Sequence, residues 1–487
     1  MLSHSKKTEK VNNIIVSKFG GSSMADANAI RRSADIAVKQ GSSVVVVSAT
    51  YGTTNRLVEI TEAADSGNRK RIVELLAEVR ASHCAIADDL AISKSSLNEL
   101  HELLDTTETV AYNLEETARR FRDDEMSGFE TDQSKTDQAE ANNNLFLIIQ
   151  RLRDRLFGMG ERMSSLLITD HLNHTGHSAT CLDAGKVIRT DDRYTHAVPQ
   201  FDTIEELCEL HIHPVIDGKQ GHIVVTQGFV GKTSEGYDTT LGRGGSDYSA
   251  AILAWGLDAD ILQIWTDVSG MSTTDPRIVP DAQPISEISF QEAAELATFG
   301  AKILHPSTLI PAIWKEIPVF VGSSIRPENG GTWIYREVGK APLVRALAIR
   351  RNQALLTLTT TQMLNTYGFL YRIFRVFNDH RVSVDSITTS EISVAMTVDD
   401  KTLRDRALIS DLEDLGQLNI EESYELISLI GNNINHTAGL AQKVFTALSD
   451  INVRMICQGA SRHNFCFLVD EGRGEQALRK LHTEFIG

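Results

Sequence analysis

The sequence predicts an α/β protein in which a largely parallel central sheet lies between helices, followed by two smaller α+β units. Short apolar runs, each followed by a glycine-rich turn and a helical pattern, recur at Ile14–Gln40 and Ile223–Leu257. The β-branched run Ser43–Ala49 is typical of a strand buried on both faces of a parallel sheet. Near the C-terminus, Leu355–Asp399 aligns without a gap with Leu426–Asp470, at a constant offset of 71 residues.

Composition limits the class of protein. With 487 residues, the chain is long enough for about two to four domains. Its 41% hydrophobic and 23% charged residues are typical of globular proteins, and a net charge of −17 argues against broad binding to nucleic acid or anionic membranes. The absence of a signal peptide or an apolar run of about 18 residues predicts a soluble cytoplasmic protein. Five scattered cysteines without CxxC spacing favour reduced thiols over disulfides or a zinc site.

The first chemically informative segment joins a strand to a helix. The apolar run Ile14–Phe19 contains Lys18 near its end, and Gly20–Ser23 (GGSS) leads into a helical pattern at Ala27–Gln40. Glycines allow backbone N–H groups to approach an anion, and a helix start attracts negative charge. We therefore expect an anion-binding turn with a lysine at its rim. The alternative is that Lys18 is a surface lysine at a strand end.

A second segment of this kind is Thr239–Ala251 (TTLGRGGSDYSAA), around which the chain is organised. It follows a predicted strand, Ile223–Val230, and precedes a helical pattern at Tyr248–Leu257. Three glycines surround Arg243, whose planar guanidinium suits a carboxylate. The spacing matches neither the Walker nor the dinucleotide-binding motif. The alternative is a turn that only has to be tight.

Three other segments give weaker indications of structure or function. Asp123–Asn144 is acidic and polar, which favours a long mobile loop or disordered insertion. The predicted helix Leu145–Leu172 that follows carries Glu161 among small residues, and a lone helical glutamate is more often solvated than functional. The Pro- and Gly-containing stretch Ile325–Lys340 is the expected domain boundary.

The C-terminal repeat predicts two βαββα units. In the alignment Gly368 matches Gly439 and Phe374 matches Phe445. Such units leave edge strands that pair between copies or between subunits. The alternative is a structural duplication that binds no ligand.

Seven motifs, in order along the chain, resemble those of the aspartate kinases, which belong to the amino acid kinase family. They are KFGGSS at Lys18–Ser23, SATYGTTN at Ser48–Asn55, GERMS at Gly160–Ser164, TTLGRGGSD at Thr239–Asp247, WTDVSG at Trp265–Gly270, TTDPR at Thr273–Arg277 and FGAKILHP at Phe299–Pro306. The C-terminal repeat resembles the ACT domains of this family. Ser383–Glu391 (SVDSITTSE) is similar to the lysine-inhibited, single-function type.

The resemblance implies an amino acid kinase domain at residues 1–340, with a mobile insertion at 123–144, and ACT domains at 341–424 and 425–487. It implies phosphorylation of the L-aspartate β-carboxylate by ATP with Mg²⁺, giving 4-phospho-L-aspartate on the route to lysine, threonine and methionine. It also implies inhibition by L-lysine and a homodimer formed through the ACT domains. Because a carboxylate with a pKa of about 4 is already ionised, no general base is needed, and catalysis rests on charge and alignment.

Site residues are implied in four groups. The expected catalytic residues are Lys18 and Asp247, with Asp247 orienting either Lys18 or a metal-bound water. Those expected to bind substrate are Ser48, Thr54, Glu161, Arg243, Gly244, Gly245 and Ser246, with Arg243 on the α-carboxylate and Glu161 on the α-ammonium. Those expected to bind ATP are Lys18, Gly20, Gly21, Ser22, Thr266, Asp267, Ser272, Arg277, Lys302 and Ile303. Those expected to bind inhibitory lysine are Met363, Thr366, Gly368, Phe369, Leu370, Ser383, Val384, Asp385, Ser390 and Glu391. No protein metal site is predicted.

One departure and two alternatives accompany this interpretation. Ser272 stands where the family usually has a tyrosine, and a lost aromatic contact of about 1 kcal/mol would weaken ATP binding several-fold. The chain could be a kinase for another acidic amino acid such as glutamate, against which stand TTLGRGGSD and the ACT pair. It could also be an inactive amino-acid sensor, against which stand the intact Lys18, Arg243 and Asp247.

Overall fold

The computed structural model describes residues 13–126, 132–218, 221–299, 308, 310–339, 341–364 and 367–487. The chain divides into a first unit, Met1–Gly270 with Ile303–Arg336, and a second unit, Met271–Lys302 with Glu337–Gly487. The end of the first unit lies close to the predicted boundary at residue 340. Residues 271–302, which we predicted in the first domain, group instead with the C-terminal unit.

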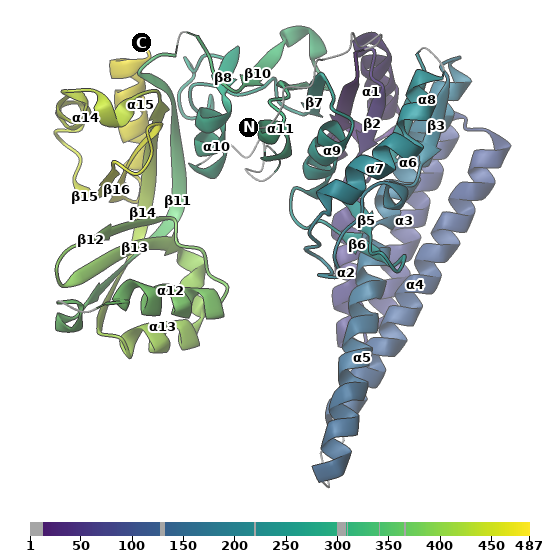
Figure 1. Cartoon of the computed structure of the whole chain (residues 1–487), viewed down its shortest axis with the longest axis horizontal. Helices are drawn as coiled ribbons and strands as arrows, with labels where there is room; N and C mark the ends of the chain where they lie inside the picture. Colours follow the sequence, from purple (N-terminus) through teal and green to yellow (C-terminus); the bar gives the residue numbers. More distant parts are fainter. Residues whose placement is uncertain are drawn as a thin grey trace, which may run out of the picture. The chain divides into compact units, whose positions relative to one another are not determined.

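The sheet of the first unit confirms the predicted, largely parallel arrangement (Figure 1). Its neighbouring strands are parallel except for the antiparallel pair at one end, β9 and β10. In spatial order they are β3 (Ala179–Leu182), β4 (Ile223–Gln227), β2 (Val44–Val47), β1 (Ile15–Phe19), β7 (Ile261–Thr266), β9 (Val319–Ser323) and β10 (Gly331–Tyr335). The strand predicted at Ile223–Val230 ends at Gln227, and β5 (Val230–Lys232) instead pairs with β6 (Asp238–Thr240).

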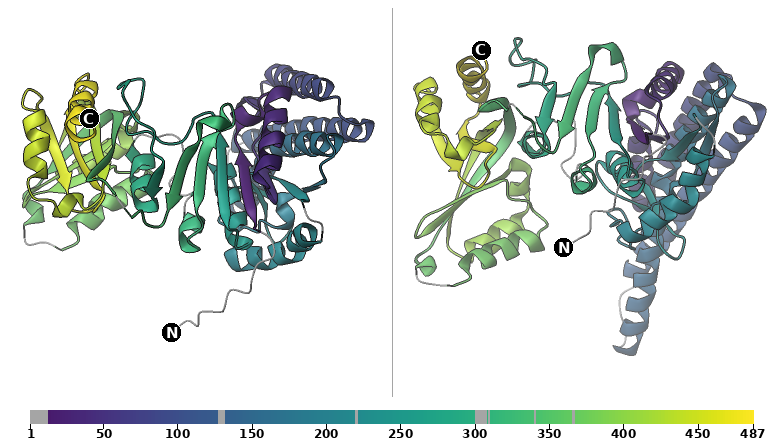
Figure 2. Two further views of the ribbon diagram at one scale, coloured as in Figure 1. Left: turned by 90° about the horizontal axis from the view of Figure 1, so that it is seen from above. Right: turned by 45° about the horizontal axis from the view of Figure 1, so that its top comes forward.

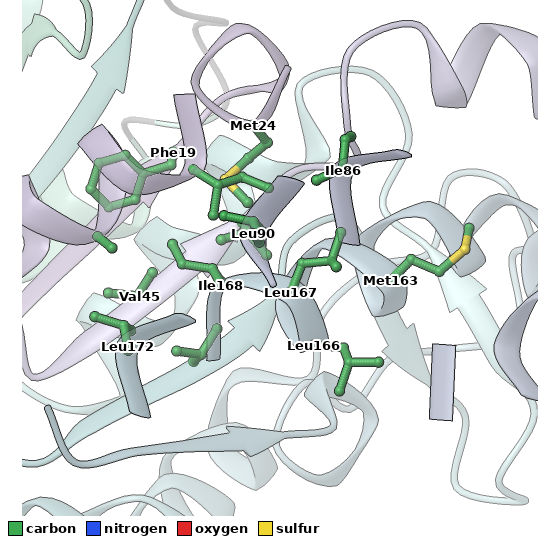
Figure 3. Close-up of a cluster of buried hydrophobic side chains, with 14 of the residues drawn as sticks. Phe19, Met24, Val45, Ile86, Leu90, Met163, Leu166, Leu167, Ile168 and Leu172 are labelled. Carbon is green, nitrogen blue, oxygen red and sulfur yellow. The ribbon is translucent and has the colours of Figure 1, made fainter. Parts of the chain in front are cut away.

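Helices cover both faces of this sheet. On one face, alternate strand residues such as Phe19, Val45 and Val225 pack with α1 (Ala27–Gln40), α3 (Arg69–Leu90) and α6 (Met159–His174). Figure 3 shows part of this core, with Phe19 and Val45 close to side chains of α6 such as Leu167, Ile168 and Leu172. Successive strand residues point to opposite faces, so the intervening residues lie on the other face, where α9 (Gly245–Gly256) packs on β1, β2 and β7. Other helices of this unit include α2 (Thr53–Ser66), α7 (Phe201–His211), α8 (His213–Asp217) and α11 (Ile310–Trp314).

The acidic stretch 123–144 corrects one prediction. The structure places its described residues at the end of α4 (Lys94–Met126) and the beginning of α5 (Asp132–Phe157), so the predicted irregular loop is wrong for these residues. Residues 127–131 lie outside the described part. The two helices pack against each other, and α5 projects from the rest of the unit (Figure 1). A helix that buries only one stripe tolerates polar residues on its other faces, so a polar composition did not exclude helix here.

The second unit confirms the two βαββα repeats, although the repeats share one sheet (Figure 2). The strand order is β12 (Ser386–Thr389), β13 (Ser393–Asp399), β11 (Val344–Thr359), β14 (Gln417–Gly431), β16 (Asn464–Asp470) and β15 (Val453–Gln458). Because β14 crosses the predicted boundary between residues 424 and 425, the repeats are structurally continuous. The helices are α12 (Phe369–Asp379), α13 (Arg406–Glu413), α14 (Leu440–Ala447) and α15 (Gly474–Phe485), and this unit also contains β8 (Glu287–Ser289) and α10 (Phe290–Phe299).

The offset of the sequence repeat reappears in the backbone. Gly368 and Gly439 precede α12 and α14 with φ values of 75° and 80°, in the left-handed region that favours glycine. Each glycine therefore starts the helix of its own repeat. Among the described helices, none is long and apolar enough to cross a membrane.

Candidate functional site

A cavity of about 560 Å³ opens where the strands of the first unit's sheet reach their carboxyl ends. Lys18 lies near the end of β1, and Ser48 follows β2 directly. The first turn of α9 and the first turn of α6 complete the wall. Open α/β sheets place ligands at this edge, because the connecting loops and helix starts converge there.

The cavity contains a close ion pair between two of its elements. Lys18 Nζ lies 2.5 Å from Asp247 Oδ1 in the first turn of α9, and both side chains are largely buried. This pair contradicts the interpretation of Lys18 as a surface lysine. A buried lysine held by one carboxylate retains two N–H donors for a further anion.

The glycine-rich turn before α9 allows a ligand to approach its backbone closely. Gly242 and Gly244 both have φ near 76°, and Gly244 is the N-cap of α9. A Cβ at Gly245 would lie 2.5 Å from the Phe229 ring, so a side chain has no room there. The N–H of Gly245 donates to Gly242 O at 3.0 Å, which leaves the N–H groups of Ser246 and Asp247, at the cavity wall, as candidates for binding an anion at this helix start.

Arg243 supplies a second cation to the same cavity. Its side chain is exposed and forms no hydrogen bond or ion pair with any residue that the structure describes. An unpaired guanidinium at a cavity wall suits a carboxylate that binds through two parallel N–H···O bonds.

Glu161 supplies an acidic side chain to the same cavity. It lies in the first turn of α6, is only 3% exposed, and its Oε2 has no partner among the described residues. Burial raises its pKa to about 7, an effect partly offset by backbone N–H groups and the charge of Lys18. The preceding Gly160 allows the close packing, since a Cβ there would lie 2.7 Å from Ala49 Cβ. An unpartnered buried carboxylate oxygen is a site for an ammonium group.

The cavity brings together the residues predicted to bind substrate. Its lining includes all of them and both predicted catalytic residues: Lys18, Ser48, Thr54, Glu161, Arg243, Gly244, Gly245, Ser246 and Asp247. Their proximity follows from the sheet, because β1, β2 and α9 present their ends at one edge.

The predicted nucleotide residues are brought together only in part. Lys18 and Gly21 line the cavity, whereas the N–H of Gly20 donates to Trp265 O at 3.1 Å. Outside the lining are Ser22, Thr266 and Asp267 in the same unit, and Ser272 and Arg277 in the second unit. Lys302 and Ile303 lie outside the described residues. The nucleotide role of these residues stays a prediction.

Several cavity residues were not predicted from the sequence, namely Thr50, Tyr51, Asn55, Phe157, Thr195, His196, Phe229 and Thr240. Thr50 and Tyr51 belong to the loop after β2, and Asn55 lies in the first turn of α2. Thr195 and Phe229 have positive φ values of 68° and 70°, a rare backbone conformation that no residue pattern predicted.

The second unit holds a separate buried carboxylate at the predicted regulatory position. Asp385 Oδ1 pairs with Arg350 Nη1 at 2.8 Å, while Asp385 Oδ2 has no partner among the described residues. Burial raises the pKa of Asp385, and the charge of Arg350 opposes that effect. Met363, Phe369 and Val384 meet in one apolar cluster beneath it.

The other predicted regulatory residues are placed individually. Gly368 and Leu370 lie at the start of α12, Ser390 Oγ contacts Ser393 Oγ at 2.7 Å, and Ser383 and Glu391 are exposed. Thr366 lies outside the described residues. In the second repeat, Arg454 is paired with Glu421 at 2.5 Å, so its charge is already compensated.

Comparisons with protein families and with individual relatives agree on the family to which this chain belongs. Residues 13–323 match the amino acid kinase family, and residues 427–485 match an ACT domain. The lysine-sensitive aspartokinase 3 of Escherichia coli is 42% identical over 97% of this chain and 99% of its own length. The chain is an aspartokinase. Aspartokinase 2 of Arabidopsis thaliana, a chloroplastic relative, is 33% identical over 97% of this chain and 84% of its own length.

Solved aspartokinase structures share the fold over nearly the whole chain. The E. coli aspartokinase III complex with aspartate and ADP, described as the R-state, has a TM-score of 0.80 and covers 97% of this chain and 100% of its own. The complex of the same enzyme with lysine and aspartate, described as the T-state, has a TM-score of 0.79 with the same coverage. Both are 42% identical to this aspartokinase.

Proposed function

We propose that this aspartokinase transfers the γ-phosphoryl group of ATP to the β-carboxylate of L-aspartate, giving 4-phospho-L-aspartate and ADP, and that L-lysine inhibits it. The observation that carries the catalytic part is one cavity that presents Arg243, without a partner among the described residues, and Glu161, whose Oε2 lacks one, beside the Lys18–Asp247 pair. An amino acid with two carboxylates and one ammonium matches this charge pattern. The E. coli relative has been crystallised with aspartate and ADP.

Each residue has a defined task in this proposal. The Arg243 guanidinium binds the α-carboxylate, and Glu161 accepts hydrogen bonds from the α-ammonium, which leaves the β-carboxylate free to attack phosphorus as the bond to the ADP oxygen breaks. Lys18 and the N–H groups at the start of α9 stabilise negative charge on the transferred group. An ionised carboxylate nucleophile needs no general base.

Strand pairing supports a nucleotide site beside Lys18. Phe19 of β1 pairs with Trp265 of β7, so Thr266 and Asp267 follow at the edge of the sheet next to the Gly20–Ser23 turn. Mg²⁺ would cancel phosphate charge, as in other kinases. Among the described residues, no group of three or more His, Cys, Asp or Glu side chains could hold a metal ion. Asp247 is the carboxylate that could hold one of its waters.

The direct test is ADP release by the purified full-length chain with ATP, Mg²⁺ and either L-aspartate, L-glutamate or no amino acid. We expect release that depends on aspartate. ADP formation that is independent of aspartate would reject the proposal. A preference for glutamate would assign the chain to another acidic substrate, and no release with any amino acid would favour the inactive sensor.

The raised pKa of Glu161 predicts a pH-dependent affinity for aspartate. Only the ionised carboxylate pairs with the substrate ammonium, and a pKa of about 7 means that most of it is protonated at about pH 6. The KM for aspartate should therefore rise roughly tenfold between about pH 8 and about pH 6. Steady-state kinetics across this range tests the prediction, and Glu161→Gln should show a flat profile. An equally steep profile in this variant would assign the titration to another group.

The regulatory part of the proposal rests on the first ACT repeat. Asp385 Oδ2 can accept the ammonium of a lysine side chain, and the backbone N–H groups that follow Gly368 can bind a carboxylate. The second repeat has Ile456 at the position of Asp385, so it lacks the acidic group. Inhibition then requires a conformation that lysine binds more tightly than the active one.

Asp385→Asn should therefore weaken lysine inhibition while leaving uninhibited activity unchanged. Loss of one charge-assisted contact raises the half-inhibitory lysine concentration about 10–150-fold. Titration of lysine, threonine and methionine against activity measures the effect. Asp379→Asn on α12, an exposed aspartate of the same repeat, is the matched control. Undiminished lysine sensitivity in Asp385→Asn, or inhibition of the parent by threonine alone, would contradict the prediction.

A homodimer through the ACT repeats completes the proposal. The first repeat exposes apolar side chains in two segments, one that leads into and includes the first turns of α12, and one formed by β12 and its following turn: Tyr367, Leu370, Tyr371, Phe374, Ile387 and Ile392. A second copy of the same surface would cover them, as expected of a two-fold interface. Sedimentation velocity of the full-length chain tests this, and a monomer at assay concentration would reject it.

A further inference from the structure

Helix α5 ends beside the cavity with a fully buried aspartate that the catalytic proposal does not use. Asp154 is 0% exposed and lines no part of the cavity, yet both of its carboxylate oxygens are occupied. Oδ1 accepts hydrogen bonds from Thr195 N at 3.0 Å and Thr240 Oγ1 at 2.9 Å. Oδ2 accepts from Thr195 N and Thr240 N, each at 2.9 Å.

The two residues held by Asp154 line the cavity from different segments. Thr195 lies in the turn before α7, and Thr240 ends β6. The N–H of Ala197 also donates to Thr240 O at 2.9 Å, which ties the turn to the strand a second time. The Asp154 carboxylate adds to the direct contacts between these segments, which also include Thr190 Oγ1 and Thr239 Oγ1 at 2.7 Å.

The Thr195 turn also touches the loop that carries Arg243. A Cβ at Gly242 would lie 2.9 Å from the His196 ring and 3.2 Å from Thr195 O, so the turn and the loop are in close contact. Thr195 has φ of 68°, a conformation that a β-branched residue adopts only when its surroundings impose it. A shift of this turn would therefore change the position of the loop next to Arg243.

Helix α5 reinforces this arrangement one turn earlier. Arg151 Nε donates to Tyr194 Oη at 2.9 Å, and its guanidinium lies 3.6 Å from the centre of the Tyr237 ring. The last turns of α5 thus hold both the 194–196 turn and the β5–β6 hairpin. Burial raises the pKa of Asp154 to about 6, which hydrogen bonds from Thr195 and Thr240 oppose.

We propose that Asp154 is a positioning residue for the amino-acid half of the active site: it holds the strained Thr195 turn against β6 and thereby sets the loop that presents Arg243. The residue acts through Thr195 and Thr240 and does not touch substrate. This inference rests on the proposed aspartate kinase activity. It predicts that binding of the amino acid is impaired while binding of ATP is not, because Lys18 and the Gly20–Ser23 turn lie on other elements.

The test compares Asp154→Asn with the parent enzyme. Asparagine keeps the shape of the side chain but turns an NH₂ group toward backbone N–H donors. We expect the KM for aspartate to rise at least tenfold, with kcat within threefold and the KM for ATP unchanged. Asp170→Asn is the matched control, since Asp170 on α6 also accepts hydrogen bonds from another segment, from Ser93 N and from Ser96 Oγ in the first turn of α4, but lies outside the cavity lining.

A second substitution separates positioning from general damage. Thr195→Gly relieves the positive φ, so adding it to Asp154→Asn should recover at least threefold of the lost aspartate affinity, whereas a purely structural role predicts no recovery. If Asp154→Asn does not fold, Thr240→Val removes the Oγ1 donor alone and should raise the aspartate KM in the same selective way. An unchanged aspartate KM in folded Asp154→Asn, a parallel loss for ATP, or no recovery with glycine would overturn the inference. Failure of the parent to phosphorylate aspartate would instead overturn the proposed function.

Discussion

Lys18→Met is expected to lower kcat about 10²–10³-fold, equivalent to about 3–4 kcal/mol in the barrier. The lysine ammonium lies at the cavity wall within 2.5 Å of Asp247, where it can meet negative charge on the transferred phosphoryl group. Methionine keeps an unbranched stem of similar length and removes only the charge. The measurement is kcat at saturating aspartate and ATP, together with thermal unfolding of the variant.

The ion pair makes the stability control essential, because Lys18→Met leaves Asp247 without its partner. Breaking a buried pair destabilises by about 3 kcal/mol. The double variant Lys18→Met/Asp247→Asn should therefore regain stability without regaining kcat. Lys315→Met breaks an ion pair with Glu205 outside the cavity and serves as the matched control. Recovery of kcat together with stability would show that Lys18 acts only through the fold.

Glu161→Gln is expected to weaken aspartate binding and to stabilise the free enzyme. Loss of a charge-assisted contact to the substrate ammonium should raise the KM for aspartate about 10–150-fold, with little change in the KM for ATP. The same substitution should stabilise the free enzyme, because the pKa of Glu161 in the folded protein, about 7, lies above its ordinary value of 4.5. Ionisation therefore costs folding free energy as pH rises between these values, and the full cost of about 3 kcal/mol persists above pH 7.

Thermal unfolding at about pH 8 and at about pH 5 tests this second effect, since the stabilisation by Glu161→Gln should nearly vanish at the lower pH. Glu292→Gln is the matched contrast. Glu292 is also buried, but it is paired with Arg345 at 2.9 Å, so its replacement should destabilise the protein. A Glu161→Gln variant with lower stability and unchanged aspartate KM would remove Glu161 from the binding site.

The local signals in the sequence predicted most of the elements that build the site. Apolar runs, glycine turns and helical periodicity are properties of neighbouring residues, so β1, β2, α1 and α9 follow from short windows. The offset of 71 residues in the repeat likewise returned in the backbone, where β13 begins at Ser393 and β16 at Asn464. The polar stretch 123–144 was predicted wrongly because its composition was interpreted without the packing of α4 against α5.

What the sequence by itself determined is therefore which residues carry charge and which turns are tight, because both depend on residue type and short spacing. Only the tertiary structure decided that Lys18, Glu161 and Arg243 share one cavity, since they lie on elements separated by long stretches of chain. It also decided that Glu161 is buried and has a raised pKa, because desolvation depends on every neighbouring element. The link from Asp154 to Thr195 and Thr240 is of the same kind, since hydrogen bonds over 41 and 86 residues leave no local pattern.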